Sequence, residues 1–292
     1  MLCPRRVWHT LPPFEVRRPT VAEVLQDLRE TSPDDALPRR VEEASLNAWP
    51  ALQQVLLDGW VLRFSKGFTR RANSVTPVYR STQPPLEKIR YCENLYAREG
   101  LPTYFRLTTW QDADGLDEAL AGRGYAQQES ARVLHRSLAT GTLAPGPGFT
   151  LAPLGSFLAT YTELTGLKGH LENSGLDGQA AANLHGSVLR AIRGETVFGL
   201  LADGGQPVAC GMAVVEGELA GLFDIVTHPD CRRRGYGRIL VQSLLAHATA
   251  MGASHAYLQV LADNVPALAL YDGLGFSTLY EYWYRVSQRP LP

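Results

Sequence analysis

A pair of glycines set among arginines in the C-terminal half carries the clearest chemical signature of the chain. Residues 223–238 read FDIVTHPDCRRRGYGR, where an apolar strand pattern ends at Pro229 and a helical pattern begins near Gly237. Two glycines separated by one residue allow a bent backbone whose N–H groups converge, and a helix N-terminus adds the positive end of its dipole. Four arginines surround this bend. The segment is therefore suited to a compact polyanion such as a pyrophosphate.

Two other phosphate-binding motifs do not fit this segment. A Walker A loop needs Gly-Lys-Ser/Thr, which does not follow here, and the third glycine of the dinucleotide fingerprint is replaced by Leu240. A plainer alternative is that the three consecutive arginines are a solvated surface run. The strand pattern before the glycines and the apolar helix pattern after them favour the anion site.

A second group of residues follows the loop in a fixed order. Residues 258–260 (LQV) have a strand pattern, and Asn264, Ala267, Leu270, Tyr271, Gly275 and Phe276 come after them. Together with Arg-x-x-Gly-x-Gly over residues 232–237, which follows a strand pattern ending in Val-Thr-His-Pro, this order resembles the GNAT superfamily of N-acetyltransferases. The resemblance covers about residues 149–287.

The resemblance implies a fold and a co-substrate. The implied fold is the GNAT fold, an α/β (α+β) architecture whose mixed, mostly antiparallel sheet has helices on both faces. The loop amides would hold the pyrophosphate of acetyl-CoA, and residues 225–227 would pair with its pantetheine arm where strands 219–227 and 255–261 splay apart. Asn264 would contact the same arm. The cofactor-binding residues expected on this basis are Ile225, Val226, Thr227, Arg232, Arg233, Arg234, Gly235, Tyr236, Gly237, Arg238, Asn264 and Ala267.

The resemblance also implies the reaction, in which an amine attacks the thioester carbonyl directly. A backbone N–H on the open strand can stabilise the resulting oxyanion. Tyr271 matches the position that often acts as general acid toward the departing thiolate; its alternative is a core aromatic side chain. A thiol has a pKa of about 8.5 and a tyrosine of about 10, so complete proton transfer from an ordinary tyrosine is uphill by about 2 kcal/mol. We therefore expect a hydrogen bond from Tyr271 or a shifted pKa.

The amine must also lose a proton. Asp224 is the nearest carboxylate, so it is the candidate general base, directly or through water. It could equally be a structural carboxylate bonded to a neighbouring loop. Glu163, His170 and Glu172 lie in the helical region that shapes the acceptor pocket of this superfamily, with a solvated surface position as the alternative for each. Cys231 lies beside arginines that lower a thiol pKa, but the resemblance gives it no role.

Hydrophobic periodicity predicts alternating elements in the second half. Strands are expected over 149–154, 197–202, 207–215, 219–227, 255–261 and 278–286, and helices over 157–167, 179–193, 237–251 and 266–271.

The first half has a similar order of predicted elements. Helices are expected over 20–30, 38–57 (with a break near Pro50), 86–98 and 116–121, and strands over 60–64, 103–108 and 129–137. Two prolines and three glycines make 141–148 a linker. The predicted organisation is an N-terminal arm with helices (1–58), a GNAT-like domain (59–140), the linker, and a catalytic GNAT domain (149–292).

A weak internal echo suggests that the two domains are related. Residues 119–125 resemble 270–276, and a predicted strand follows each. The first half has no Arg-x-x-Gly-x-Gly loop, and Leu120 echoes Tyr271, so this half is expected to be degenerate. Its segment 67–75 (GFTRRANSV) either helps to bind the acceptor at an interdomain cleft or is a solvated connection between strands.

Composition narrows the function classes. The 292 residues contain 28 Lys and Arg against 29 Asp and Glu, which argues against a nucleic-acid partner. Four scattered cysteines form neither a disulfide framework nor a zinc site, so no metal is expected. No apolar run is long enough to span a membrane, and prolines and Glu15 interrupt the N-terminus where a signal would need apolar residues. We expect a cytoplasmic protein, either a pseudo-dimeric monomer or a homodimer.

The sequence predicts an N-acetyltransferase that transfers the acetyl group of acetyl-CoA to a primary amine of a small molecule, an amino acid or a peptide. Two alternatives stay open. One is a non-catalytic acyl-CoA-binding sensor, which acetyl-CoA would stabilise without turnover. The other is a protein-modifying acetyltransferase, which would need an open, extended cleft.

Overall fold

The computed structural model describes residues 33–111, 115–138, 144–167 and 176–287. From Pro38 onward the chain forms one compact unit. Its centre is a single sheet of eleven strands in the order β1-β2-β3-β4-β11-β5-β10-β9-β8-β7-β6. The strands are β1 (Gln53–Leu57), β2 (Trp60–Phe64), β3 (Val75–Pro77), β4 (Tyr104–Thr108), β5 (Tyr125–Ser137), β6 (Phe149–Leu151), β7 (Glu195–Asp203), β8 (Gln206–Glu216), β9 (Leu219–Thr227), β10 (His255–Leu261) and β11 (Ser277–Ser287).

The sheet is mostly antiparallel, as predicted. Only the neighbours β3 with β4 and β9 with β10 run parallel. The described helices are α2 (Pro33–Ala48), α3 (Pro85–Arg98), α4 (Leu116–Gly122), α5 (Leu154–Thr165), α7 (Gly178–Ala191), α8 (Tyr236–Ala250) and α9 (Val265–Asp272). The turns η1 (Arg70–Ala72) and η2 (Pro229–Cys231) are 3₁₀-helical.

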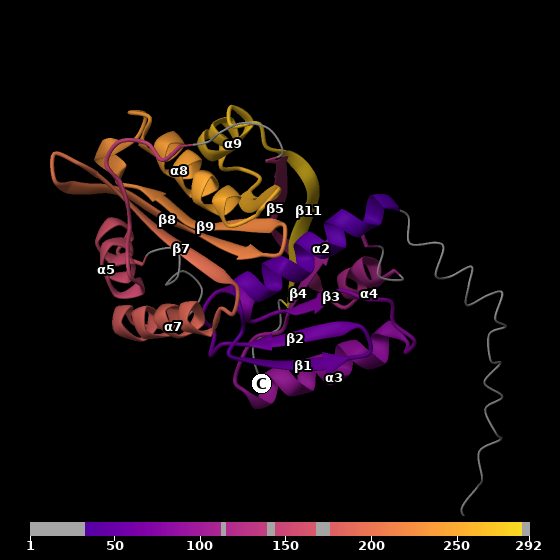
Figure 1. Ribbon diagram of the computed structural model, residues 1–292. Coiled ribbons are helices and arrows are strands. Elements are labelled where there is room, and N and C mark those ends of the chain that lie inside the picture. Colours follow the sequence, from indigo (N-terminus) through magenta and orange to yellow (C-terminus); the bar gives the residue numbers. More distant parts are fainter. Residues whose placement is uncertain (1–32, 112–114, 139–143, 168–175, 288–292) are drawn as a thin grey trace, which may run out of the picture. The chain divides into compact units, whose positions relative to one another are not determined.

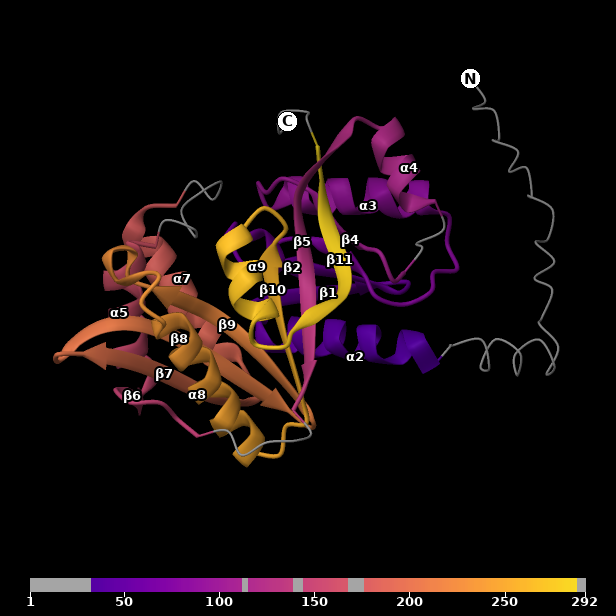
Figure 2. The same ribbon diagram turned by 90° about the horizontal axis from the view of Figure 1, so that it is seen from above.

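Helices cover both faces of the second half of the sheet (Figures 1 and 2). The alternation of β7 shows this, because successive side chains of a strand point to opposite faces. Phe198 packs against Phe157 of α5, with ring centroids 5.0 Å apart. A Cβ at the next residue, Gly199, would lie 3.0 Å from Leu244 of α8. The expectation of helices on both faces is therefore confirmed.

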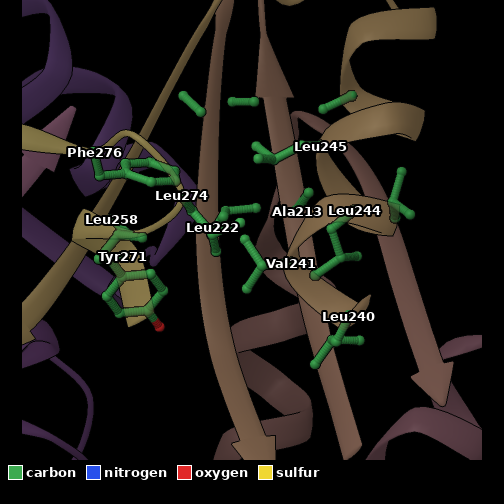
Figure 3. Close-up of a cluster of buried hydrophobic side chains, with 14 of the residues drawn as sticks. Ala213, Leu222, Leu240, Val241, Leu244, Leu245, Leu258, Tyr271, Leu274 and Phe276 are labelled. Atoms are coloured by element: carbon green, nitrogen blue, oxygen red, sulfur yellow. The ribbon is translucent and has the colours of Figure 1, made fainter. Parts of the chain in front are cut away.

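The main core lies between α8, α9 and the strands below them. Leu240, Val241, Leu244 and Leu245 form the buried face of α8, as their helical spacing predicts (Figure 3). A second cluster lies in the first half, where α3 and α4 pack on β2 and β4. Both halves of the chain thus bury apolar side chains against the same sheet.

The sheet runs without a break across the two halves. β11, the last strand of the chain, lies between β4 and β5 and pairs with both (Figure 2). β5 also pairs with the whole length of β10, from His255↔Ser137 to Leu261↔Ala131. The division into domains at residues 59–140 and 149–292 stays a prediction, and so does the tandem origin.

The prediction of a helix over residues 38–57 is right for its first part and wrong after Pro50. Residues Gln53–Leu57 form β1, which pairs with β2 through a tight turn at Asp58 and Gly59. These two residues have φ angles of 42° and 82°. Asp-Gly favours such a two-residue hairpin turn, and this local signal outweighs the helical spacing of Leu52, Val55 and Leu56.

The other predicted elements from residue 60 onward are present, with shifts of a few residues at their ends. The three-residue strand β3 and the turn η1 were not predicted. The predicted helix over 20–30 and the start of the linker lie outside the described residues.

Candidate active site

The loop after β9 has the backbone that its glycines suggest. Gly235 precedes α8 with φ 89°, in the left-handed region that favours glycine. Apart from the adjoining backbone, no atom of the described residues lies within 4 Å of the position that a Cβ of Gly235 would take. Glycine is therefore required at residue 235 by its backbone angle, and the space beside it is open. The helix begins at Tyr236, one residue before the predicted start.

The four arginines of the loop differ in their exposure and in their hydrogen-bond partners. Arg232, Arg233 and Arg234 are exposed. Arg234 lies 3.8 Å from Asp203, and the Nε of Arg232 donates to the carbonyl of Thr227 at 3.5 Å. Arg238 instead donates to the carbonyl of Gly273 at 2.8 Å, which ties α8 to the end of α9.

Tyr236 also has a partner within the fold. Its hydroxyl donates to Asp203, the last residue of β7, and this hydrogen bond raises the pKa of Tyr236. The aromatic ring thereby links the start of α8 to the neighbouring hairpin.

The strands β9 and β10 separate where the resemblance expects a gap. They pair only from His255↔Leu219 to Leu258↔Leu222, although both strands continue. A bulge in the pairing of β8 with β9 marks this point, between Cys210 and Met212. The backbone of residues 225–227 therefore lacks β10 as a neighbour along the described strands.

Asp224 and Gly211 explain the bulge. Asp224 has φ 52°, an uncommon value for a residue other than glycine. Opposite it, a Cβ at Gly211 would lie 2.5 Å from the Cδ1 of Ile225. The terminal methyl of Ile225 thus occupies the space beside Gly211, at the bulge where β9 stops pairing with β10.

Tyr271 lies in the main core, with 7% of its surface exposed. Its ring packs edge-on against Phe276, and the hydroxyl points away from that ring (Figure 3). Burial raises the pKa of Tyr271 to about 12. The side chain is thus a protonated phenol at neutral pH, and giving up its proton costs more than in an ordinary tyrosine.

Asp224 forms a buried pair with a histidine that sequence reasoning missed. The Nε2 of His185, on α7, donates to Oδ2 of Asp224 at 2.8 Å. The side chain of His185 is 0% exposed and that of Asp224 is 4% exposed. The two groups come from different elements, so no local pattern could have paired them.

Aromatic side chains surround the histidine of this pair. Ring centroids of Trp49 and Phe68 each lie 5.9 Å from that of His185, and Tyr161 of α5 lies at 4.8 Å. Burial, and then the charge of Asp224, raise the pKa of Tyr161. Trp49 and Phe68 belong to the first half of the chain, so both halves contribute to the surroundings of the candidate base.

The segment 67–75 is largely buried, which contradicts its interpretation as a solvated connection. Phe68, Ala72, Asn73, Ser74 and Val75 are all at most 2% exposed. The side chain of Asn73 makes four hydrogen bonds to the backbone of residues 65–69, which tie this segment together.

The remaining candidates have varied surroundings. The Oδ1 of Asn264 accepts from the backbone N–H of Ala267 at 3.3 Å and so caps α9. Glu163 is exposed, and Cys231 is half-buried against the main core. His170 and Glu172 lie outside the described residues.

Among the described residues, no group of three or more His, Cys, Asp or Glu side chains is placed to hold a metal ion. None of the described helices has the length and apolar character needed to cross a membrane.

Comparison with solved structures defines the class of protein. A GCN5-related N-acetyltransferase from Kribbella flavida superposes with a TM-score of 0.58 at 15% identity, over 86% of this chain and 96% of that one. The fold is therefore that of the GNAT N-acetyltransferases, as the sequence motifs predict. The chain belongs to the family described as "Probable histone acetyltransferase Rv0428c C-terminal", whose model matches residues 36–285.

Proteins that are similar in sequence to this chain are also N-acetyltransferases by name. The uncharacterized N-acetyltransferase YobR of Bacillus subtilis is 27% identical over 258 residues, which are 86% of this chain and 98% of YobR. The [ribosomal protein bS18]-alanine N-acetyltransferase of Salmonella typhimurium is 39% identical over 71 residues, 24% of this chain and 48% of the relative. The protein is an acyltransferase of the GNAT type.

Proposed function

We propose that the protein transfers the acetyl group of acetyl-CoA to a primary amine of a small molecule, an amino acid or a peptide. The observation that carries this proposal is the opening between β9 and β10 beside the glycine loop at the start of α8. An open strand edge can pair with an extended amide-containing arm, and converging N–H groups at a helix N-terminus bind phosphate.

The residues at the loop fit such a cofactor. The space beside Gly235 is open, and three exposed arginines flank it. Residues 233–238 would hold the pyrophosphate, and residues 225–227 would hold the pantetheine arm. Asn264 and Ala267 would lie along that arm, with Asn264 also shaping the start of α9. When bound, acetyl-CoA supplies the thioester that the amine attacks.

Two side chains are proposed for proton handling. Tyr271 would donate a hydrogen bond toward the leaving sulfur; its high pKa favours this over full proton transfer in advance. Asp224 would accept the proton of the amine, directly or through a water molecule. His185 donates to Asp224 from a fully buried position, so it is a positioning residue that holds this carboxylate.

A glycine substitution tests the cofactor site. Gly235→Val should abolish acetyl-CoA binding in calorimetry, because a β-branched residue is strained at φ 89° and its side chain would enter the open space. Gly252→Val is the matched control, since Gly252 has φ 98° at the far end of α8 and also has open space beside it. Retained binding in Gly235→Val, or equal loss in both variants, would contradict the loop assignment.

A second experiment tests the base and the reaction. Asp224→Asn should lower kcat for CoA release with an amine by about a hundredfold and leave acetyl-CoA binding intact. If the unaltered protein binds acetyl-CoA and releases no CoA with any amine in a broad panel, it is a sensor rather than an enzyme.

A protein acceptor is the second candidate function. One relative is named for a ribosomal protein substrate, and the matching family is described as a probable histone acetyltransferase. Parallel incubations of radiolabelled acetyl-CoA with a ribosomal protein extract and with the amine panel would distinguish the two: labelled protein supports a macromolecular acceptor, and labelled small amines support the first candidate.

A further inference from the structure

Arg71 lies beside the candidate base with its charge unmatched by any acid in the described part of the chain. It belongs to the turn η1 and is half-buried. Its Cζ lies 4.7 Å from the ring centroid of Trp49 and 5.9 Å from that of Phe223. Within the described ranges its guanidinium forms no ion pair and no hydrogen bond. A guanidinium stays protonated, and removing it from water is costly unless an anion compensates.

The neighbouring arginine differs in this respect. Arg70 lies over the rings of Tyr104 and Tyr284, and it also pairs with Glu129 at 2.9 Å and with Gln128 at 3.1 Å. Both arginines have two aromatic neighbours, but only Arg70 has a carboxylate. In this turn, therefore, one arginine has a carboxylate partner as well as aromatic contacts, and the other has aromatic contacts alone.

Buried polar side chains fix the backbone that presents Arg71. Arg63 is 2% exposed and donates to the carbonyl of Arg71 at 2.6 Å and to that of Leu46 at 3.0 Å. It also donates to the carbonyl of Trp49. Asn73 holds the preceding loop through its four backbone hydrogen bonds. The position of Arg71 is therefore set in advance, which reduces the entropy lost on binding an anion.

Trp49 connects Arg71 to the candidate base. Its ring stacks on Phe223 with centroids 6.1 Å apart, and it lies 5.9 Å from His185. Phe223 is the residue directly before Asp224 in β9. Arg71 and His185, the partner of Asp224, thus contact the same indole ring. A molecule with a cationic amine and an anionic group could place the amine at Asp224 and the anion at Arg71.

We propose that Arg71 binds an anionic group, carboxylate or phosphate, on the amine acceptor and so selects acceptors that carry one. This inference rests on the proposed acetyltransferase function and specifies its substrate class. A guanidinium fork binds either oxyanion through two parallel hydrogen bonds, and the indole beneath it keeps the fork in place.

Matched acceptor pairs test the proposal by CoA release. The common amino acids are compared with their carboxamides, and O-phosphoethanolamine with ethanolamine, each at saturating acetyl-CoA. For at least one pair we expect the acid to have a kcat/KM about tenfold or more above that of its neutral partner. Arg71→Gln should raise the KM for that acid about tenfold and leave the neutral partner and the KM for acetyl-CoA unchanged. Which pair responds distinguishes carboxylate from phosphate.

Arg70→Gln is the matched control, with the same change of charge one residue away. It should leave the preference for the acid intact. The proposal is overturned if every neutral partner is used as well as its acid, or if the two variants lose the preference equally.

A different measurement tests the anion site if the protein acetylates no amine. If no amine of either kind releases CoA, the proposed function fails, and the same pairs are then compared as ligands by thermal shift in the presence of CoA. Stabilisation by an acid in the unaltered protein but not in Arg71→Gln supports the anion site. Equal shifts for acids and neutral partners, including none, overturn it.

Discussion

Tyr271 is a core aromatic residue and also a candidate hydrogen-bond donor, and one physical property underlies both. Its ring belongs to the main core and packs on Phe276, while its hydroxyl points away from that ring. The same burial that makes it a core residue raises its pKa to about 12. A buried phenol that stays protonated is a hydrogen-bond donor over the whole physiological pH range.

Removing this hydroxyl gives a prediction at the residue scale. Tyr271→Phe should reduce kcat about tenfold to a hundredfold while acetyl-CoA binding changes little, because a hydrogen bond to the leaving sulfur matters most as the bond breaks. The melting temperature should stay close to that of the unaltered protein, since the ring is kept. Unchanged turnover would show that Tyr271 is a core residue alone.

The pH profile gives a check on the same residue. Because the pKa of Tyr271 is raised to about 12, its ionisation should not produce a fall in kcat between pH 7 and about 10. A tyrosine-dependent fall near pH 10 that disappears in Tyr271→Phe would contradict the burial argument.

At the scale of elements, the bulge in β9 decides where the sheet opens. Gly211 on β8 leaves room for Ile225, and Asp224 adopts a positive φ beside it. Beyond this point β9 no longer pairs with β10. The predicted strand 219–227 is confirmed, but a strand pattern has a period of two residues and does not reveal which strand will carry a bulge.

Gly211→Val tests this role of the bulge. The added side chain would overlap the terminal methyl of Ile225 and also approach Leu240 and Leu244, so the side chain of Ile225 must move within the bulge. We expect a lower melting temperature, with a destabilisation of about 1–3 kcal/mol, and weaker acetyl-CoA binding. Gly217→Val is the control, since Gly217 lies in the β8–β9 turn with no neighbours within 4 Å. Equal effects on cofactor binding in both variants would contradict the prediction.

At the scale of the whole molecule, buried contacts join the two halves. Glu42, on α2, pairs with Arg106 of β4, and the hydroxyl of Tyr280 on β11 donates to the same carboxylate at 2.6 Å. On the other side of β11, His135 of β5 and His255 of β10 lie with ring nitrogens 3.0 Å apart. Residues from the start, middle and end of the chain therefore stabilise one sheet.

The histidine pair predicts a pH dependence of stability. Burial, and then the neighbouring His255, lower the pKa of His135. The unfolded chain therefore takes up a proton more readily than the folded one as the pH falls through the usual histidine range, near pH 6.5. This contribution is present above that range and is lost below it, so the melting temperature should fall between pH 7.5 and 5.5.

His135→Gln should make this fall smaller, and His247→Gln, on α8, should leave it unchanged. Differential scanning fluorimetry at matched ionic strength measures both. A fall of the same size in all three proteins would place its origin elsewhere in the molecule.

Local sequence patterns are enough to predict the glycine loop, the order of most elements and the GNAT class, because these depend on residues that lie near one another along the chain. Turn chemistry, helix spacing and strand alternation act over a few residues. The contacts between side chains that are distant in sequence become visible only in the folded chain: His185 with Asp224, Trp49 with His185, and Arg71 with Phe223. Those contacts depend on how helices pack across a sheet whose strands come from both halves. Burial then shifts the chemical properties of these side chains. The spacing of residues along the chain predicts neither how they pack nor how deeply they are buried.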